Sequence, residues 1–166
     1  MPFTLDRIKT SQEIRYWQDN IPVEYLYTVG DVAEKFFERI RDEAKITGIR
    51  CGNCRLVYVP PRSYCEKCFA RLEEWVELEP KGCVETYTII HVDTKGSKLE
   101  KPVVLAKIKI DNAHGGFIHK LGEVNTEDVK IGMRVEAVFE DKDKRKGSIL
   151  DIKYFRPADQ PKTVDK

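Results

Sequence analysis

The sequence predicts an α+β protein, in which N-terminal helices come before a small metal-binding hairpin and a C-terminal β-domain. Three observations support this order. Apolar residues recur at helical intervals before residue 47, four cysteines form two close pairs between residues 51 and 68, and β-branched residues are frequent after residue 83. We therefore expect a helical arm over residues 1–47, the hairpin over 48–79, the β-domain over 80–157 and a flexible tail over 158–166.

The N-terminal arm is predicted to contain two helices. The first is capped by Ser11 and runs to Trp17, and the chain then breaks at Pro22 because proline disrupts a helix interior. The second is clearer, since apolar residues over Val32–Ile40 lie three or four positions apart with charged residues between them. The arm also carries more aromatic side chains than so short a segment can bury alone. They are expected either to pack on the rest of the protein or to form a protein-protein interface.

The paired cysteines are the strongest chemical signal in the chain. Cys51 and Cys54 form one Cys-x-x-Cys pair, and Cys65 and Cys68 form the second after a gap of ten residues. Each pair can fold into a tight turn, called a knuckle, that points two thiolates inward, so that four sulfurs meet around one Zn²⁺. Because all four ligand positions would then be filled, we expect the zinc to stabilise the fold and not to catalyse.

The residues around the cysteines predict the hairpin of a rubredoxin-like zinc ribbon. Ile46–Arg50 is expected to enter it as a strand and Leu72–Leu78 to leave it, with Trp75 covering the knuckles. Between the two pairs, an apolar run suits a short strand, and two consecutive prolines then turn the chain. The spacing of the cysteines and the predicted hairpin thus both indicate a zinc ribbon.

Two disulfides or a redox-active Cys-x-x-Cys would use the same four residues. However, the sequence shows no secretory signal peptide, and neither pair is surrounded by the βαβ pattern of redox motifs. Thiolate ligands must stay reduced, which indicates a cytoplasmic protein. No apolar run approaches the ~18 residues of a membrane span, so we expect a soluble protein with no membrane partner.

The segment after Cys83 has the pattern of a β-domain. Five candidate strands are rich in β-branched and aromatic residues and are separated by turn residues. A single helical turn is predicted over Asn125–Asp128, between the third and fourth strands. Five strands with a short helix before the fourth is the order of an OB-fold barrel. The predicted strands are Val84–Val92, Val103–Ile110, Gly116–Leu121, Arg134–Phe139 and Ser148–Phe155.

Nucleic-acid binding is the alternative function that the two predicted domains suggest. Zinc ribbons and OB-folds both commonly bind single strands. Yet Lys and Arg total 29 and Asp and Glu total 28, so the chain lacks the excess of positive charge expected of a dedicated nucleic-acid binder. The predicted second and third strands also offer only one aromatic residue, Phe117, for base stacking.

Cys83 is the one cysteine outside the pairs. A catalytic role for it would need a histidine base and an oxyanion hole within reach. The three histidines, His91, His114 and His119, lie in no recognisable catalytic motif. We therefore expect Cys83 to be a small buried residue and the protein not to be an enzyme.

Several short motifs follow one another in a characteristic order. They are Phe36-Phe37, Gly48-Ile-Arg-Cys51, Val59-Pro-Pro-Arg62, Tyr64-Cys65, Gly82-Cys-Val84, Glu85-Thr-Tyr-Thr88, Pro102-Val-Val-Leu-Ala106 and Gly132-Met-Arg-Val135. This succession resembles the zinc-ribbon OB-fold acyl-CoA-associated family, long known as a domain of unknown function, over residues 28–157. The most specific part is the Pro-Pro-Arg run before the second cysteine pair.

The resemblance implies a non-catalytic subunit that bridges enzymes and helps to bind CoA. Members of the family resemble small partners of thiolases, including the archaeal assembly that joins acetoacetyl-CoA thiolase to hydroxymethylglutaryl-CoA synthase. Others accompany acyl-CoA hydratases or steroid aldolases. The implied partners are thus a thiolase, a hydroxymethylglutaryl-CoA synthase-like enzyme, or both, and the implied ligand is an acyl-CoA.

Three residues are candidates for contacts with CoA. Arg62 can offer a forked, permanently charged donor to a phosphate, and Lys95 and Lys98 lie in a charged loop after the first strand of the β-domain. The alternatives are a structural contact of Arg62 near the zinc site and a loop whose lysines are simply solvated.

Overall fold

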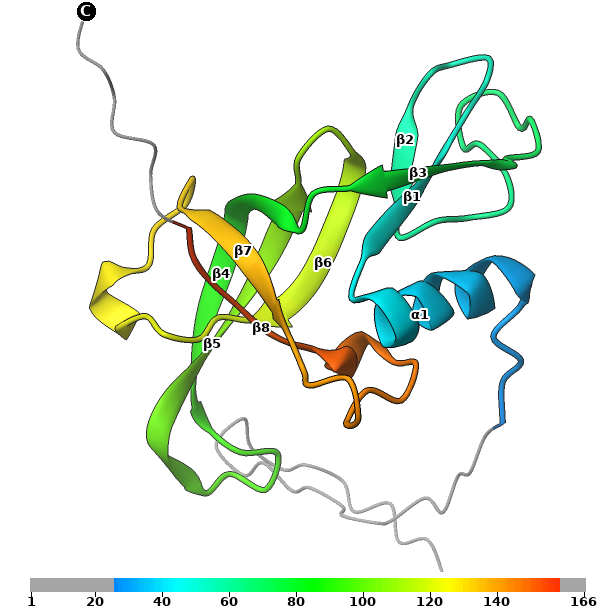
Figure 1. Cartoon of the computed structure of the whole chain (residues 1–166). Coiled ribbons are helices and arrows are strands. Elements are labelled where there is room, and N and C mark those ends of the chain that lie inside the picture. The colour runs from blue at the N-terminus through cyan, green and yellow to red at the C-terminus, as the bar shows by residue number, and fades with distance from the viewer. Residues whose placement is uncertain (1–25, 159–166) are drawn as a thin grey trace, which may run out of the picture.

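The computed structural model describes residues 26–158. Within this range the protein is mostly β, with one α-helix, two short 3-10 helices and eight strands (Figure 1). The expected N-terminal helices are therefore represented by one described helix. The predicted helix Ser11–Trp17 and residues 159–166 of the predicted tail lie outside the described residues. No helix in residues 26–158 has the length and apolar character needed to cross a membrane.

Helix α1 (Asp31–Glu43) confirms the helical pattern that the sequence shows over Val32–Ile40. Gly30 is its N-cap residue, and no side chain caps the first turn. The helix ends where Ala44 turns into the left-handed conformation, with a φ of 55°, and donates its N–H to the carbonyl of Ile40 at 3.1 Å. One face of the helix buries Phe36 and Ile40.

The ribbon is a three-stranded antiparallel sheet. Strand β1 (Ile46–Arg50) lies in the middle and pairs with β2 (Val57–Val59) on one side and β3 (Glu74–Leu78) on the other. The first cysteine pair lies in the loop between β1 and β2, and the second lies in the loop between β2 and β3. The predicted strand Ile46–Arg50 is confirmed at both ends.

The C-terminal half contains five strands that follow the predicted pattern. The first begins earlier than expected, at Lys81, where it also pairs with the fourth, and the second begins earlier, at Lys98, because it extends into the hairpin with the first. The last begins later because 3-10 helix η2 (Ile149–Asp151) occupies its predicted start. The predicted helical turn is 3-10 helix η1 (Thr126–Asp128). A bridge between Leu121 and Phe155 brings the end of the third of these strands beside the fifth. The five strands are β4 (Lys81–Val92), β5 (Lys98–Ile110), β6 (His114–Lys120), β7 (Arg134–Phe139) and β8 (Ile152–Pro157).

The ribbon and the C-terminal strands form one continuous sheet, in the order β3-β1-β2-β6-β5-β4-β7-β8. The junction is a short parallel pairing of β2 with β6, in which Val59 lies opposite Gly115. A Cβ atom on Gly115 would lie 2.1 Å from the carbonyl oxygen of Val59, and the residue has a φ of 117°. Only glycine fits at this point, so Gly115 allows the two sheets to meet.

The buried residues form two hydrophobic cores. The larger core joins α1 to the C-terminal strands, and within it the ring of Phe36 stacks on that of Phe117 with centroids 6.1 Å apart. The smaller core surrounds the cysteines and contains Tyr58 and Leu72. Trp75 packs partly against both cores, as its predicted place beside the knuckles requires. Of the aromatic residues of the arm, Phe36 is therefore a packing residue.

The loop before β8 is organised by one buried carboxylate. Asp151 is 4% exposed, and its two oxygens accept hydrogen bonds from the backbone N–H groups of Lys146, Gly147 and Ser148 at 2.9, 2.7 and 3.2 Å. The same loop reaches α1, since the guanidinium of Arg145 donates to the carbonyl of Ile40 at 3.1 Å. The loop thus helps to hold the helix on the C-terminal strands.

Candidate metal centre

The first cysteine pair forms a tight knuckle directly after β1. The backbone N–H of Cys51 donates to the carbonyl of Leu56 at 2.8 Å, and the N–H of Arg55 donates back to the carbonyl of Cys51 at 2.7 Å. Arg55 adopts the left-handed conformation, with a φ of 59°. The N–H of Cys54 points at the sulfur of Cys51 at 3.3 Å.

The second pair repeats the same backbone geometry. The N–H of Cys65 donates to the carbonyl of Ala70 at 2.9 Å, and the N–H of Phe69 donates to the carbonyl of Cys65 at 2.9 Å. Phe69 also adopts the left-handed conformation, with a φ of 58°. Two knuckles of identical hydrogen bonding therefore face each other, each presenting two sulfurs.

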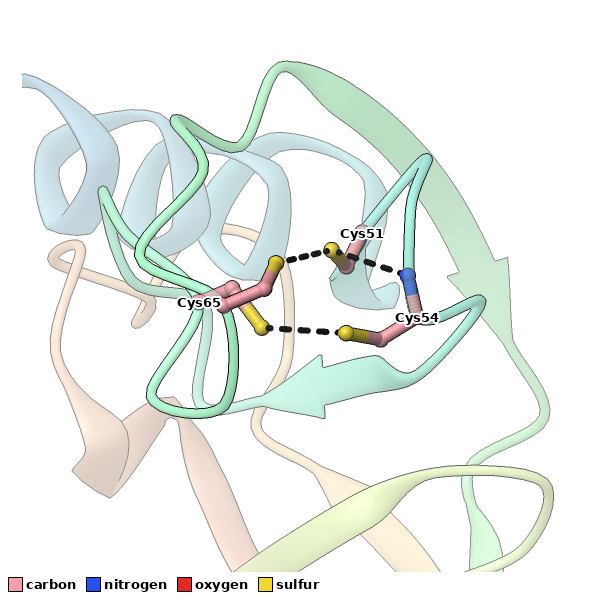
Figure 2. Close-up of side chains that lie close together, drawn as sticks. Cys51, Cys54 and Cys65 are labelled. Carbon is pink, nitrogen blue, oxygen red and sulfur yellow. Dashed lines mark hydrogen bonds between the residues drawn. The ribbon is translucent and has the colours of Figure 1, made fainter.

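The four sulfurs lie at the spacing of a tetrahedral zinc site. Cys51 Sγ is 3.6 Å from Cys68 Sγ, Cys54 Sγ is 3.9 Å from Cys65 Sγ, and all four lie within 4.8 Å of one another (Figure 2). A tetrahedron with Zn–S bonds of about 2.3 Å has S–S edges of about 3.8 Å. Cys51 and Cys65 are fully buried, whereas Cys54 and Cys68 are half-buried. The donor set and its spacing fit zinc.

Hydrogen bonds around the sulfurs separate the pKa values of the thiols. The phenol of Tyr58 lies 3.1 Å from Cys65 Sγ, which lowers the pKa of Cys65 to about 6 and raises the pKa of Tyr58 to about 12. The hydrogen bond to Cys68 and burial raise the pKa of Cys54 to about 12. Binding of zinc must therefore displace a proton from Cys54, and metal affinity falls as the solution becomes acidic.

Two side chains at the metal centre were missed from the sequence. Tyr58 reaches Cys65, and the amide of Asn53 donates to Cys68 Sγ at 3.9 Å. Tyr58 lies in the apolar run between the cysteine pairs, but that run does not show which of its residues faces the sulfurs. Polar residues between paired cysteines, such as Asn53, could have been considered as donors to the thiolates.

Arg62 is held on the ribbon. Its Nη1 donates to Glu66 Oε2 at 2.6 Å, and its guanidinium carbon lies 4.7 Å from the centroid of the Tyr58 ring. Glu66 Oε1 also lies 2.9 Å from His114 Nε2, and the hydrogen bonds from Arg62 and His114 lower the pKa of Glu66. Arg62 thus makes a structural contact beside the metal centre, and its role toward CoA stays a prediction.

Lys95 and Lys98 lie in the hairpin between β4 and β5. The N–H of Lys95 donates to the carboxylate of Asp93 at 2.8 Å, which shapes the turn, and both lysine side chains are exposed. The tip of this hairpin and the ribbon lie at opposite ends of the molecule in Figure 1. The structure therefore does not bring the two lysines together with Arg62, and their contact with CoA also stays a prediction.

Cys83 lies in β4, where it is half-buried and opposite Lys109 of β5. The histidines have other partners: His114 Nε2 meets Glu66, and His119 Nε2 lies 3.4 Å from the carbonyl of Ile149. Among residues 26–158 no hydrogen bond joins Cys83 to a histidine, so the structure adds nothing in favour of a catalytic Cys83.

Two family models match the chain. Residues 40–74 match the rubredoxin-like zinc ribbon domain of ChsH2, and residues 75–140 match its C-terminal OB-fold domain. The matched segments cover the metal centre and most of the C-terminal strands. The protein is therefore built from a zinc ribbon and an OB-fold domain, and its cofactor is zinc.

Similar proteins are found among archaea. A DUF35 domain-containing scaffold protein of Methanocaldococcus jannaschii is 38% identical over 104 residues, which are 62% of this chain and 73% of the relative. One from Pyrococcus furiosus is 30% identical over 104 residues, which are 63% of this chain and 75% of the relative.

Solved structures show the same fold. The crystal structure of a DUF35 protein of unknown function from Sulfolobus solfataricus has a TM-score of 0.57 and 36% identity, covering 66% of this chain and 78% of that one. The Ltp2-ChsH2(DUF35) aldolase has a TM-score of 0.56 and 22% identity, covering 74% and 91%, and shows the fold alone. The chain therefore belongs to the DUF35 family, which joins a rubredoxin-like zinc ribbon to a C-terminal OB-fold domain.

Proposed function

We propose that Cys51, Cys54, Cys65 and Cys68 hold one structural Zn²⁺. The S–S distances of 3.6 and 3.9 Å support this assignment, as they are close to the edges of a ZnS₄ tetrahedron. Each ligand contributes metal-binding free energy that is also folding free energy. Elemental analysis of purified protein should thus find one zinc per chain.

The test of the ligand set is a Cys65→Ser variant. It should lose zinc and melt at a lower temperature, whereas the control Cys83→Ser should keep its zinc. A Cys65→Ser protein that retains both its zinc and its melting temperature would contradict the assignment.

We further propose that the protein is a non-catalytic subunit that bridges acyl-CoA enzymes, with a thiolase and a hydroxymethylglutaryl-CoA synthase-like enzyme as partners. The metal centre carries this proposal, since four cysteines leave a zinc ion no open position for water or substrate. The names of the archaeal relatives, which are called scaffold proteins, support it, as does the shared fold with a DUF35 aldolase.

The finer features of this proposal concern the C-terminal domain and the CoA contacts. We propose that β4 to β8 close into a five-stranded barrel and that the protein works in the cytoplasm. Lys95 and Lys98, which form no ion pair within residues 26–158, would meet phosphates of an acyl-CoA at the β4–β5 hairpin. Arg62 would have to release Glu66 to do the same at the ribbon.

Co-purification tests the bridging role. The full chain, purified at moderate salt from its source cells, should carry a thiolase that mass spectrometry identifies, and removal of residues 1–30 should abolish the association. The protein alone should show no turnover of acetoacetyl-CoA with CoA. Tight, salt-sensitive binding to single-stranded DNA or RNA, without an enzyme partner, would favour the nucleic-acid alternative instead.

A further inference from the structure

An apolar groove lies beside the junction of the ribbon and the C-terminal strands. Its walls come from α1, from the two prolines that follow β2, from β6 and from η2. Every residue that lines the groove is apolar. Its volume of about 320 Å³ is at the lower end of the range of roughly 300–1,000 Å³ found for ligand pockets, so it suits one or two large side chains.

The lining residues of the groove differ in their exposure. Phe36 and Phe117 are buried, and their rings stack on each other. Phe37 is half-buried, whereas Pro60 is exposed and Ile118 is 75% exposed. An apolar group in the groove would remove water from Pro60 and Ile118 and would rest against side chains that the core already holds in place.

The chain supplies an apolar segment close to this groove. Ala33, the third residue of α1, lines the groove, and residues 1–25 precede the helix by only the five residues 26–30. The stretch from Trp17 to Ala33 can span about 50 Å when extended, so its length does not limit the reach of the segment. A group on the same chain is also present at an effective concentration on the order of 1 mM, which favours it over a separate molecule.

Two side chains of this segment have the chemistry that the groove requires. Ile14 and Trp17 both belong to the helix that the sequence predicts over Ser11–Trp17, and they are three positions apart and therefore on one face of it. Apolar residues at this spacing are the anchors by which helices bind apolar grooves. A helix so short is not stable by itself in water, so it needs a surface on which to pack.

We propose that the segment Ser11–Trp17 of this chain docks in the groove, with the ring of Trp17 against Phe37 and Ile118 and with Ile14 beside it. The groove is then covered by the chain to which it belongs. This inference goes beyond the proposed bridging function, since it concerns one chain alone and needs no partner enzyme. Any other apolar ligand that uses the groove must first displace Trp17.

Tryptophan fluorescence of the full chain tests the proposal. The chain has two tryptophans, so Trp75→Phe leaves Trp17 as the only one. Quenching of Trp17 by acrylamide should be at least about threefold weaker in the folded protein than in the same protein unfolded in guanidinium, because a docked ring is shielded from solvent. If Trp75→Phe does not fold, the difference between the wild type and Trp17→Phe reports the same ring.

A matched pair of variants tests where the ring docks. Ile118→Glu puts a charge at the groove and should remove most of the protection of Trp17, because an apolar ring does not satisfy a carboxylate. The control is Ile131→Glu, which changes an isoleucine that is 68% exposed and does not line the groove, and it should leave the quenching unchanged. Both isoleucines are exposed, so neither variant should unfold the protein, and circular dichroism checks this.

Loss of protection in Ile118→Glu alone, in a protein that sediments as a monomer, would support the docking of the segment in its own groove. If Trp17 is quenched as easily in the folded protein as in the unfolded one, the segment does not dock. Equal effects of Ile118→Glu and Ile131→Glu would show that the ring is not held in the groove. Protection that disappears on dilution, together with a dimer in sedimentation, would assign the groove to the segment of a second copy and overturn the inference.

Discussion

Replacing Asp151 tests whether one carboxylate holds the loop before β8 in place. In Asp151→Ala, the N–H groups of Lys146, Gly147 and Ser148 lose their acceptor at once. The residue is 4% exposed, so water cannot fully replace the lost oxygens without opening the loop. Because the loop also binds α1 through Arg145, the damage should spread to the packing of the helix.

The size of the effect follows from the hydrogen bonds. A bond to a charged acceptor contributes about 1.5–3 kcal/mol, and these three share one carboxylate, so their losses do not add fully. We expect Asp151→Ala to lower the free energy of unfolding by about 4 kcal/mol. Asp151→Asn should cost about half as much, since one amide oxygen can still accept the bonds of Gly147 and Ser148 but the amide nitrogen cannot serve Lys146.

Guanidinium unfolding at neutral pH, with zinc present throughout, measures these differences. The control is Asp141→Ala, which removes an exposed aspartate of the same loop and its surface ion pair with Lys144 and should leave stability within experimental error. If Asp151→Ala is no less stable than Asp141→Ala, or if Asp151→Asn is less stable than Asp151→Ala, the proposed role of the carboxylate is refuted.

Three further predictions concern single positions. Gly115→Ala should lower the free energy of unfolding by at least about 2 kcal/mol, because its Cβ would lie 2.1 Å from the carbonyl oxygen of Val59. The control is Gly96→Ala: Gly96 also has a positive φ but has open space around it, so the free energy of unfolding should fall clearly less in the same assay. Burial lowers the pKa of His119 below its unfolded value of about 6.5, so protonation favours unfolding, and stability should be full above that pH and decrease as the pH falls below it. Melting curves between pH 7 and 5 should show a smaller decrease for His119→Phe than for the wild type, and an equal decrease would contradict this. Cys83→Ala should leave the activity of a reconstituted acyl-CoA enzyme complex within a few-fold in a coupled assay, and a loss of several orders of magnitude in the folded variant would indicate catalysis by this thiol.

Local patterns of the sequence determined much of this protein. The spacing of the cysteines predicted a zinc ribbon because a knuckle is made of consecutive residues and its geometry depends only on them. Strand β7 (Arg134–Phe139) and β1 (Ile46–Arg50) were predicted at both ends, since the alternation of apolar and polar residues and the bordering turn residues are also local. Helix α1 was predicted from the same kind of periodicity.

Contacts between distant segments were decided only by the tertiary structure. The parallel pairing of β2 with β6 joins residues more than fifty positions apart, and the sequence of neither strand indicates which strand it pairs with. Arg62 is a candidate for a CoA phosphate by its chemistry alone, but only folding places Glu66 and the ring of Tyr58 beside it. Asp151 looked like an ordinary residue of a final strand, and only its burial against three backbone N–H groups gave it a role.

Phe69 shows most clearly what the sequence determines and what the tertiary structure decides. The sequence places it one residue after a cysteine of the second pair, where a hydrophobic residue could cover the metal centre or face solvent. Which of these occurs depends on the backbone angle that the knuckle imposes and on the neighbours that the fold brings near. The knuckle holds Phe69 in the left-handed conformation and leaves it 79% exposed, and no other segment within residues 26–158 covers the ring.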